Sequence, residues 1–293
     1  MKSYTNIIVL ILLTFIYSCS IKQEKPLAMT NFYPWCIVGF DSIDRTPDER
    51  IDMLKELGFT KYAYDLRPED LNEMSYELSL AKENEIEIIA VWLWLNAKRD
   101  SLDKLSPSNE RIFEILKNQQ LSTTLWLSFN NNFFEGQTQE QSINRAIEMI
   151  EFIYKKAEEI DCNIALYNHQ GWFGDHKNQL EIIEAMPQCS LKIVYNFHHA
   201  HENLDEFPEI ITKIKPYLSF VNLNGMKQEG PKILPIGQGD YESEMINLLM
   251  KEGFDGPWGI LGHIESEDVK KVLERNIEGL DSLVQVDAIQ RMN

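Results

Sequence analysis

The chain has 293 residues and a formal net charge of −18, with 46 acidic residues against 28 basic ones. Such an acidic chain lacks the basic surface that binding to a phosphate backbone needs, so a nucleic-acid partner is not expected. The same charge argues, more weakly, against an anionic sugar phosphate as substrate. After an N-terminal leader is set aside, about 270 residues remain, which is enough for one large core.

The N-terminus has the layout of an export signal. Lys2 precedes an apolar run over 7–16 that is too short for a comfortable membrane span, and Cys19 follows it. The segment resembles a bacterial lipoprotein signal, which predicts a signal peptide over 1–19, lipidation of Cys19 and a polar tether over 20–30. We therefore expect a periplasmic or outer-membrane-anchored lipoprotein of a Gram-negative bacterium, held to the membrane only by its lipid. An ordinary signal peptide and an uncleaved anchor are the alternatives.

The cysteines form no metal-binding pattern. If Cys19 carries lipid, Cys36, Cys162 and Cys189 remain, and none of them falls in a CxxC spacing. We expect buried free thiols, with a disulfide between Cys162 and Cys189 as the alternative.

The rest of the chain alternates between short β-rich runs and amphipathic stretches with helical spacing. The predicted strands are Trp35–Phe40, Lys61–Tyr64, Ile86–Leu95, Thr123–Phe129, Asn163–Tyr167, Leu191–Asn196, Leu218–Leu223 and Trp258–Leu261. The predicted helices are Pro47–Leu57, Glu69–Asn84, Asn109–Gln119, Gln139–Glu159, Gln179–Ala185, Phe207–Ile214 and Glu242–Lys251. Eight such units predict an α/β fold, a single (β/α)8 TIM barrel over 31–293. An open doubly wound sheet is the alternative, but no GxGxxG turn follows the first strand.

Five of the six histidines lie where a predicted strand ends. His169 follows the fifth strand, His198, His199 and His201 follow the sixth, and His263 follows the eighth. The chemistry of such barrels occurs at this end of the strands, and a neutral imidazole there can bind a divalent ion or move a proton. The histidines therefore predict one active site, in which His169, His199 and His263 are catalytic.

Several polar and aromatic residues accompany the histidines at the strand ends. Glu265 is a candidate base or supporting residue beside His263, and Trp172 offers a flat platform for a sugar or simply packs its loop. On an extended strand His169 shares a face with Tyr167, whereas Asn168 points the other way. The remaining predicted substrate-binding residues are Asp65, Trp94, Asn168, Asn196, Asn222, Asn224 and Gln238.

These features resemble the xylose isomerase-like barrel superfamily, which includes sugar isomerases and epimerases as well as endonuclease IV. The sequence ALYNH at 165–169 is similar to the family's "LENH", and YNFHHAH at 195–201 is similar to its "D-x-x-H". The glycine-rich loop at 235–240 and the GFDGP segment at 253–257 match two further family motifs in the right order. The resemblance implies a barrel that binds a divalent metal and acts on a carbohydrate.

The family's metal ligands are mostly replaced in this chain. By the resemblance, the ligand positions of strands five to eight fall on Tyr167, Asn196, Asn222 and Leu261. No carboxylate remains at any of these positions. Either the site has moved to neighbouring residues or the metal has been lost.

A moved site would be rich in histidine. His169 and His263 each lie two residues past a replaced position, and His199 keeps the family's spacing from Asn196. Together with His198 they are the predicted metal ligands, and such a set would favour zinc, manganese or iron.

The leading hypothesis for function is a sugar isomerase or epimerase that removes a proton next to a carbonyl of a neutral sugar or keto-sugar. A lyase or hydratase that cleaves 3-keto-glycosides by β-elimination shares that first step and fits an exported protein. The alternative from another class is a sugar-binding lipoprotein without catalysis, which the missing carboxylates would favour.

Overall fold

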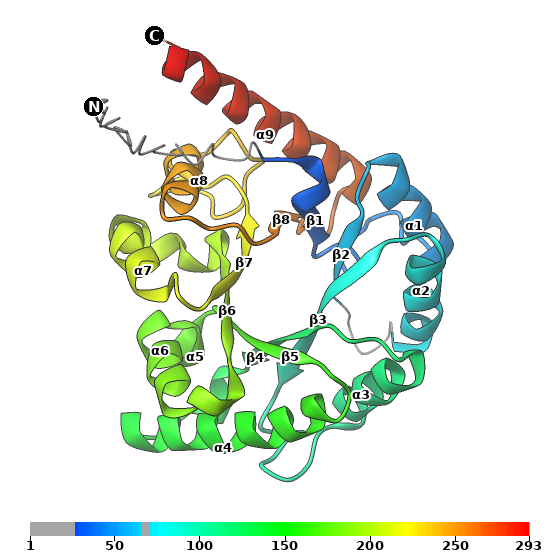
Figure 1. Ribbon diagram of the computed structural model, residues 1–293, viewed down its shortest axis with the longest axis vertical. Coiled ribbons are helices and arrows are strands. Elements are labelled where there is room, and N and C mark those ends of the chain that lie inside the picture. The colour runs from blue at the N-terminus through cyan, green and yellow to red at the C-terminus, as the bar shows by residue number, and fades with distance from the viewer. Residues whose placement is uncertain (1–26, 66–70, 293) are drawn as a thin grey trace, which may run out of the picture.

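The computed structural model describes residues 27–65 and 71–292, with side chains through 283. Eight parallel strands form one sheet in the order β1-β8-β7-β6-β5-β4-β3-β2, and helices surround it (Figure 1). Among the described residues no ladder joins β1 to β2, although these two strands lie side by side. The strands are β1 Phe32–Trp35, β2 Lys61–Tyr64, β3 Glu87–Leu95, β4 Thr124–Phe129, β5 Asn163–Tyr167, β6 Lys192–Asn196, β7 Leu218–Leu223 and β8 Trp258–Leu261. The predicted single (β/α)8 barrel is therefore confirmed, as a nearly closed one.

The helices begin where the sequence supplies capping side chains. Thr46 and Thr138 each form a capping box, with Glu49 and Gln141 respectively, so both helix starts are satisfied locally. The α-helices are α1 Pro47–Glu56, α2 Leu71–Glu83, α3 Pro107–Gln119, α4 Gln139–Glu158, α5 Gly171–Gly174, α6 His176–Ala185, α7 Phe207–Ile214, α8 Glu242–Lys251 and α9 Val269–Met292. The 3-10 helices are η1 Met29–Asn31, η3 Asn131–Phe133, η4 Pro187–Cys189 and η5 Phe197–Glu206.

The first strand lies earlier in the chain than predicted. It runs over Phe32–Trp35 and pairs with β8 from Phe32 opposite Trp258 to Trp35 opposite Leu261. The prediction of Trp35–Phe40 was wrong: the strand contains Pro34, which has no amide hydrogen for a ladder. Proline is tolerated here because β1 is hydrogen-bonded on one side only, and the strand ends at Cys36, whose φ is +57°.

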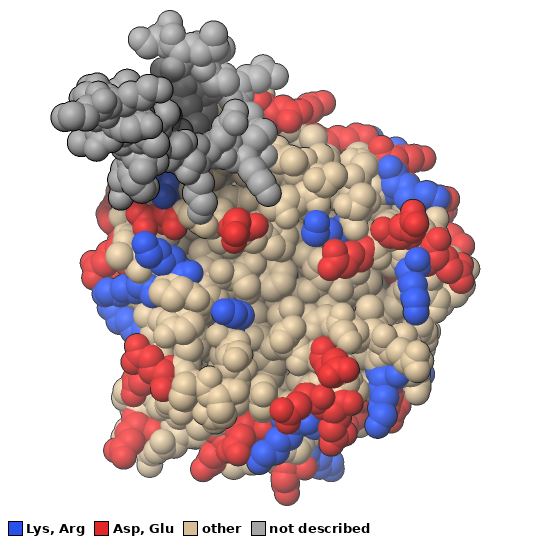
Figure 2. Space-filling model, viewed as in Figure 1, with Lys and Arg blue, Asp and Glu red and all other residues tan. Residues whose placement is uncertain are grey.

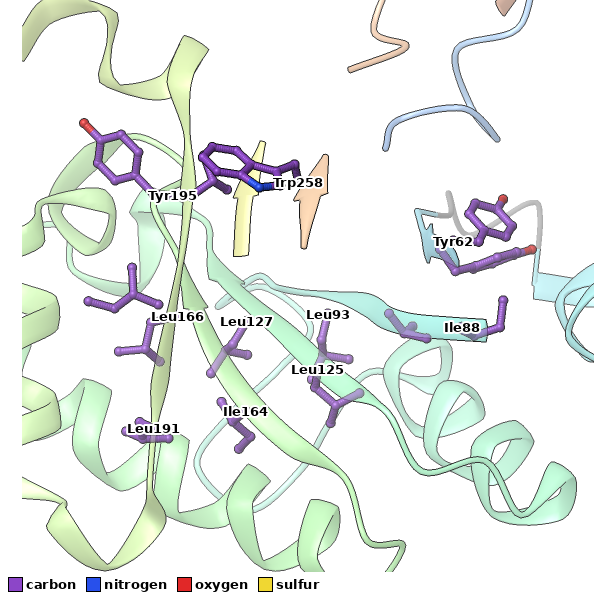
Figure 3. Close-up of a cluster of buried hydrophobic side chains, with 14 of the residues drawn as sticks. Tyr62, Ile88, Leu93, Leu125, Leu127, Ile164, Leu166, Leu191, Tyr195 and Trp258 are labelled. Atoms are coloured by element: carbon purple, nitrogen blue, oxygen red, sulfur yellow. The ribbon is translucent and has the colours of Figure 1, made fainter. Parts of the chain in front are cut away.

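Side chains alternate between two buried layers. The outward-facing residues of the strands pack against the helices, and Leu93, Leu127, Ile164 and Tyr195 belong to this layer (Figure 3). The inward-facing residues fill the barrel and are unusually aromatic: Tyr33, Trp35, Trp92, Trp126, Tyr167 and Phe220. The barrel interior is thus a packed core with polar atoms on its rings.

Charged side chains lie mostly over the surrounding helices. On the face shown in Figure 2, the Lys, Arg, Asp and Glu side chains gather around the periphery, and the surface near the middle is largely uncharged. None of the described helices is long and apolar enough to cross a membrane. The predicted signal peptide, its lipidated Cys19 and most of the tether lie outside the described residues. Cys36, Cys162 and Cys189 are buried and none of them is in a disulfide with a described residue, so the alternative disulfide between Cys162 and Cys189 is not formed.

Candidate active site

Four histidine rings form a continuous row at the carboxyl ends of β5, β6 and β8. The ring centroids of His169 and His199 are 4.4 Å apart, those of His199 and His198 are 3.7 Å apart, and those of His198 and His263 are 5.8 Å apart. The strand β6 ends at Asn196, and the 3-10 helix η5 then brings both His198 and His199 into the row. The expected convergence is therefore seen for four histidines.

Aromatic side chains border this row. The ring of His169 lies 4.7 Å from that of Trp94 and 5.8 Å from that of Trp92. At the other end of the row, the ring of His263 lies 3.9 Å from that of Phe40. Trp92 and Trp94 are partly exposed, so their indole faces are available to a ligand at the barrel mouth.

A neutral hydrogen-bond network lies directly beneath the histidines. The Tyr167 hydroxyl oxygen accepts hydrogen bonds from Trp35 Nε1 at 3.2 Å and from Asn196 Nδ2 at 2.6 Å. Asn196 Oδ1 lies 2.8 Å from His198 Nδ1, so the network reaches the row of histidines. These residues come from three strands, β1, β5 and β6, and from η5. His198 is the one acidic or basic residue among them.

A second pair of the network connects β1 to β7. The Tyr33 hydroxyl donates to Asn222 Oδ1 at 2.8 Å, while Asn222 Nδ2 is buried and finds no acceptor among the described residues. A buried amide hydrogen without a partner is costly, because it has given up water without replacing it.

Burial keeps the central histidines neutral. Desolvation, together with the neighbouring imidazoles, lowers the pKa of His169 to about 4 and that of His198 to about 3. The pKa of His199 lies still lower for the same reasons, with His198 as its strongest neighbour. At neutral pH each of these rings therefore offers one N–H donor and one lone pair.

The backbone is strained where two of these strands meet the mouth. Gln170, directly after His169, has φ of +54° and ψ of +170°, and Cys36 has φ of +57° at the end of β1. Residues other than glycine adopt such angles at a cost, and they gather at functional sites. The strain is consistent with a functional role for this edge of the barrel.

Three of the predicted substrate-binding residues hold the loops instead. Asn168 faces away from the barrel and bonds both backbone groups of Asn196, extending the pairing of β5 with β6. Asn224 Nδ2 donates to the carbonyls of Gly225 and Lys232 within the loop after β7. Asp65 Oδ1 accepts from the amides of residues 37 and 38, and burial raises its pKa to about 6.

Two further residues singled out in the sequence, Trp172 and His201, have their partners elsewhere. Trp172 packs on Phe134 with ring centroids 4.4 Å apart and donates to Gln139, so the alternative of loop packing describes it better than a sugar platform. His201 Nε2 lies 2.6 Å from the Lys227 carbonyl oxygen. Gln238 and Glu265 are exposed, and Glu265 lies two residues past His263.

The sequence analysis missed the aromatic half of the site. Trp35, Tyr33 and Trp126 fill the barrel beside the network, and Trp35 is within 5.9 Å of Tyr167 and 4.7 Å of Trp126 by ring centroid. The signal was present in the alternation of Tyr33 and Trp35 around Pro34, but it was hidden by the misplaced first strand.

Comparison with known proteins agrees with this fold. Residues 39–283 match the family described as xylose isomerase-like TIM barrel, and the chain belongs to that family. A search of curated protein sequences finds no significant match.

Solved structures share the fold at low sequence identity. A 3-keto-D-glucoside 4-epimerase from E. coli is 11% identical, with a TM-score of 0.59 over 86% of this chain and 99% of that one. A D-psicose 3-epimerase solved with D-fructose is 14% identical, with a TM-score of 0.63 over 86% and 97% of the two chains. A protein solved with a bound zinc atom is 12% identical, with a TM-score of 0.60 over 82% and 93%. Another relative was solved in complex with magnesium.

The residues at the mouth do not fit the divalent metal that these relatives suggest. Among the described residues, no group of three or more His, Cys, Asp or Glu side chains is arranged to hold a metal ion. His198 and His199 lie ring against ring, and His198 Nδ1 is directed at Asn196. Tyr167, at a family ligand position, is likewise occupied by hydrogen bonds with its neighbours. The arrangement thus gives no support to the predicted metal role of His169, His198, His199 and His263.

Proposed function

We propose that the protein is an enzyme of the isomerase or epimerase type, which moves the proton on the carbon next to the carbonyl of a neutral sugar or keto-sugar. The observation that carries this proposal is the row of four imidazoles beside two partly exposed indoles at the carboxyl end of the barrel. The family membership supports it, since epimerases share this fold.

The mouth has the chemistry of an uncharged sugar site. Indole faces stack on the apolar faces of sugar rings, and neutral imidazoles bond hydroxyl groups as donors and acceptors. Trp92 and Trp94 supply such faces on one side of His169. The acidic chain does not favour an anionic phosphosugar, so a substrate without phosphate fits best.

The pair formed by His169 and His199 can carry the proton transfer. The lone pair of one neutral imidazole takes the proton from carbon, and that ring becomes an imidazolium. The N–H of the other imidazole donates a hydrogen bond to the carbonyl oxygen and stabilises the enediolate that forms, so the two new charges offset each other. Return of a proton to the neighbouring carbon gives an isomer, and return to the opposite face of the same carbon gives an epimer. The low pKa values of these rings keep both in the neutral form that this exchange requires.

A lyase acting on 3-keto-glycosides is the second candidate. It begins with the same proton removal and then expels the group on the β-carbon. The predicted export signal favours this candidate, because glycosides rather than sugar phosphates occur outside the cytoplasm. The product separates the two candidates: an isomerase keeps the sugar intact, whereas a lyase releases an aglycone.

The direct test is exchange of substrate hydrogen with solvent. The full chain is incubated in D2O with a panel of ketoses and 3-keto-glucosides, and deuterium next to the carbonyl is followed by NMR. We expect incorporation with at least one substrate, and a loss of at least 100-fold in His199→Asn and in His169→Asn. His201→Asn is the matched control, because His201 sits in the same 3-10 helix but bonds Lys227.

The outcomes separate the alternatives. Binding of a sugar without exchange or products in the native protein would contradict an enzyme and favour a sugar-binding protein. Exchange that is equally fast in His169→Asn and His199→Asn would show that another group moves the proton. Elemental analysis of the same sample reports any bound metal independently of activity.

A further inference from the structure

A small cavity lies behind the barrel mouth, between β6 and the helices α6 and α7. Its volume is about 30 Å³, and its walls include Asn168, His176, Gln179, Tyr195 and His199. Tyr195 belongs to the layer of side chains that packs toward the helices (Figure 3). His199 is the one wall residue that also belongs to the row of histidines, so it separates the cavity from the mouth.

Three buried polar atoms of this wall find no hydrogen-bond partner among the described protein atoms. They are Gln179 Nε2, the Tyr195 hydroxyl and His199 Nδ1. Gln179 is 1% exposed and Tyr195 is 3% exposed, so bulk water does not satisfy them. Buried polar groups are nearly always paired, and each orphan costs about 1–3 kcal/mol, so three orphans around one cavity indicate that the cavity has a polar occupant.

We propose that this cavity binds one ordered water molecule, which bridges Gln179, Tyr195 and Nδ1 of His199. A water needs roughly 10–15 Å³ of such space and two to four polar partners, and the cavity supplies both. Gln179 Nε2 donates to the water, and the Tyr195 hydroxyl either donates or accepts.

The water acts as a positioning group for His199. Because it bonds Nδ1 from behind, it fixes one tautomer of the ring and the direction of Nε2 toward the mouth, where His199 contacts Tyr167 and His169. Gln179 and Tyr195 are then positioning residues, since they reach the mouth only through the water. The water site stands on its own, and only its meaning for catalysis rests on the proposed function.

Because His199 is buried and neutral, its tautomer decides which ring nitrogen carries the lone pair. Desolvation holds the pKa of His199 well below its usual range, so the ring is neutral at pH 7 and exists as one of two tautomers. Without a partner at Nδ1 the two forms would compete, and only one of them offers a lone pair at Nε2.

The test combines crystallography with NMR. Gln179→Met and Tyr195→Phe together remove the polar groups while keeping the side-chain volumes nearly unchanged. The matched control is Tyr154→Phe, which removes a hydroxyl from α4 that bonds Glu158 at the surface. Ordered water is sought in crystal structures at about 1.5 Å resolution, and the tautomer of His199 is read from the 15N shifts of its two ring nitrogens.

We expect density for water in the native protein and in Tyr154→Phe, and an empty cavity in the double variant. His199 should show one tautomer in the first two proteins and a mixture in the third, with no change at His201, which is not part of the cavity wall. An empty cavity in the native protein, or the same His199 tautomer in all three, would overturn the proposal. If the double variant does not fold, the single variant Tyr195→Phe takes its place in both measurements. None of these readouts requires a substrate, so failure of the proposed function would leave them unaffected.

Discussion

The protein contains two buried polar clusters that differ in how completely they are satisfied. The first lies between β2 and the helices α1 and α2, where Glu77 accepts from Arg50 at 2.8 Å, from Tyr62 at 3.1 Å and from Tyr64 at 3.4 Å. It is charged, and its carboxylate is bonded through both oxygens. The second is the neutral cluster at the barrel mouth, where Asn222 Nδ2 and His199 Nδ1 are buried and find no hydrogen-bond partner among the described residues.

This difference in hydrogen-bond satisfaction distinguishes a cluster with a structural role from one that can bind a ligand. A closed network has no capacity left for a ligand, so the Glu77 cluster can only hold helices to the barrel. Orphan donors and acceptors beside exposed rings cost stability, and a protein keeps them where a ligand or water completes them. Saturation of hydrogen bonds is thus a better guide to the site here than the number of charged residues.

The largest expected effect on stability comes from the Glu77 cluster. Glu77→Leu leaves the Arg50 guanidinium buried without its partner and should lower the free energy of unfolding by about 3–5 kcal/mol. Urea unfolding measures this effect, with Glu73→Leu on the exposed face of the same helix as the control. A loss below 1 kcal/mol would show that the cluster does not have the assigned structural role.

The neutral cluster at the barrel mouth should make the free energy of unfolding depend on pH. His169 takes up its proton only near pH 4 when folded, but near pH 6.5 when unfolded, so the unfolded state binds more protons between these values. The native protein therefore loses stability as the pH falls from 6.5 to 4. His169→Asn should lose about 2–3 kcal/mol less over the same range.

Urea unfolding of both proteins at pH 7 and pH 4 tests this difference. The pKa of Asp65 is raised to about 6, so its protonation increases the free energy of unfolding as the pH falls, opposite to the effect of His169. Asp65 is present in both proteins and cancels from the comparison. Parallel pH profiles would contradict a buried, neutral His169.

The pair that joins β1 to β7 provides a smaller test. Tyr33→Phe leaves Asn222 Oδ1 without its donor and should cost about 1–2 kcal/mol of unfolding free energy. The double variant Tyr33→Phe/Asn222→Leu removes both partners together with the orphan Nδ2, so its stability should stay within about 1 kcal/mol of the native value. Additive losses in a double-mutant cycle would refute the pairing.

The smallest effect distinguishes the two candidate sugar platforms. Trp94→Leu should weaken sugar binding about fivefold to tenfold, because Trp94 lies beside His169. Trp172→Leu should leave the affinity unchanged, since that ring packs on Phe134. Calorimetric titration with a ligand found in the exchange assay gives both affinities. Weaker binding in Trp172→Leu than in Trp94→Leu would show that the sugar binds at the α5 turn instead.

The barrel could be predicted from the sequence because its signals are local. The strands β2, β5, β7 and β8 have the predicted bounds, and strand alternation placed Tyr167 and Asn168 on opposite faces, as found. The first strand could not be placed in this way, because the tolerance of Pro34 depends on which neighbour it pairs with.

The site was predictable only at the level of its histidines. His198, His199 and His201 are close in sequence, but the 3-10 helix η5 directs the first two to the mouth and the third to a carbonyl of the next loop. Spacing along the chain does not determine that geometry. Likewise, the use of Asn168 to extend a ladder depends on the register between β5 and β6.

The most direct test of the central claim is an NMR titration of the full chain, with 15N-labelled histidine, against the sugar identified by the exchange assay. The account predicts that the ring signals of His169, His198, His199 and His263 shift with one common affinity, while those of His176 and His201 do not. Shifts confined to His176 or His201, or a sugar that is turned over without disturbing the four rings, would contradict the assignment of the mouth as the active site.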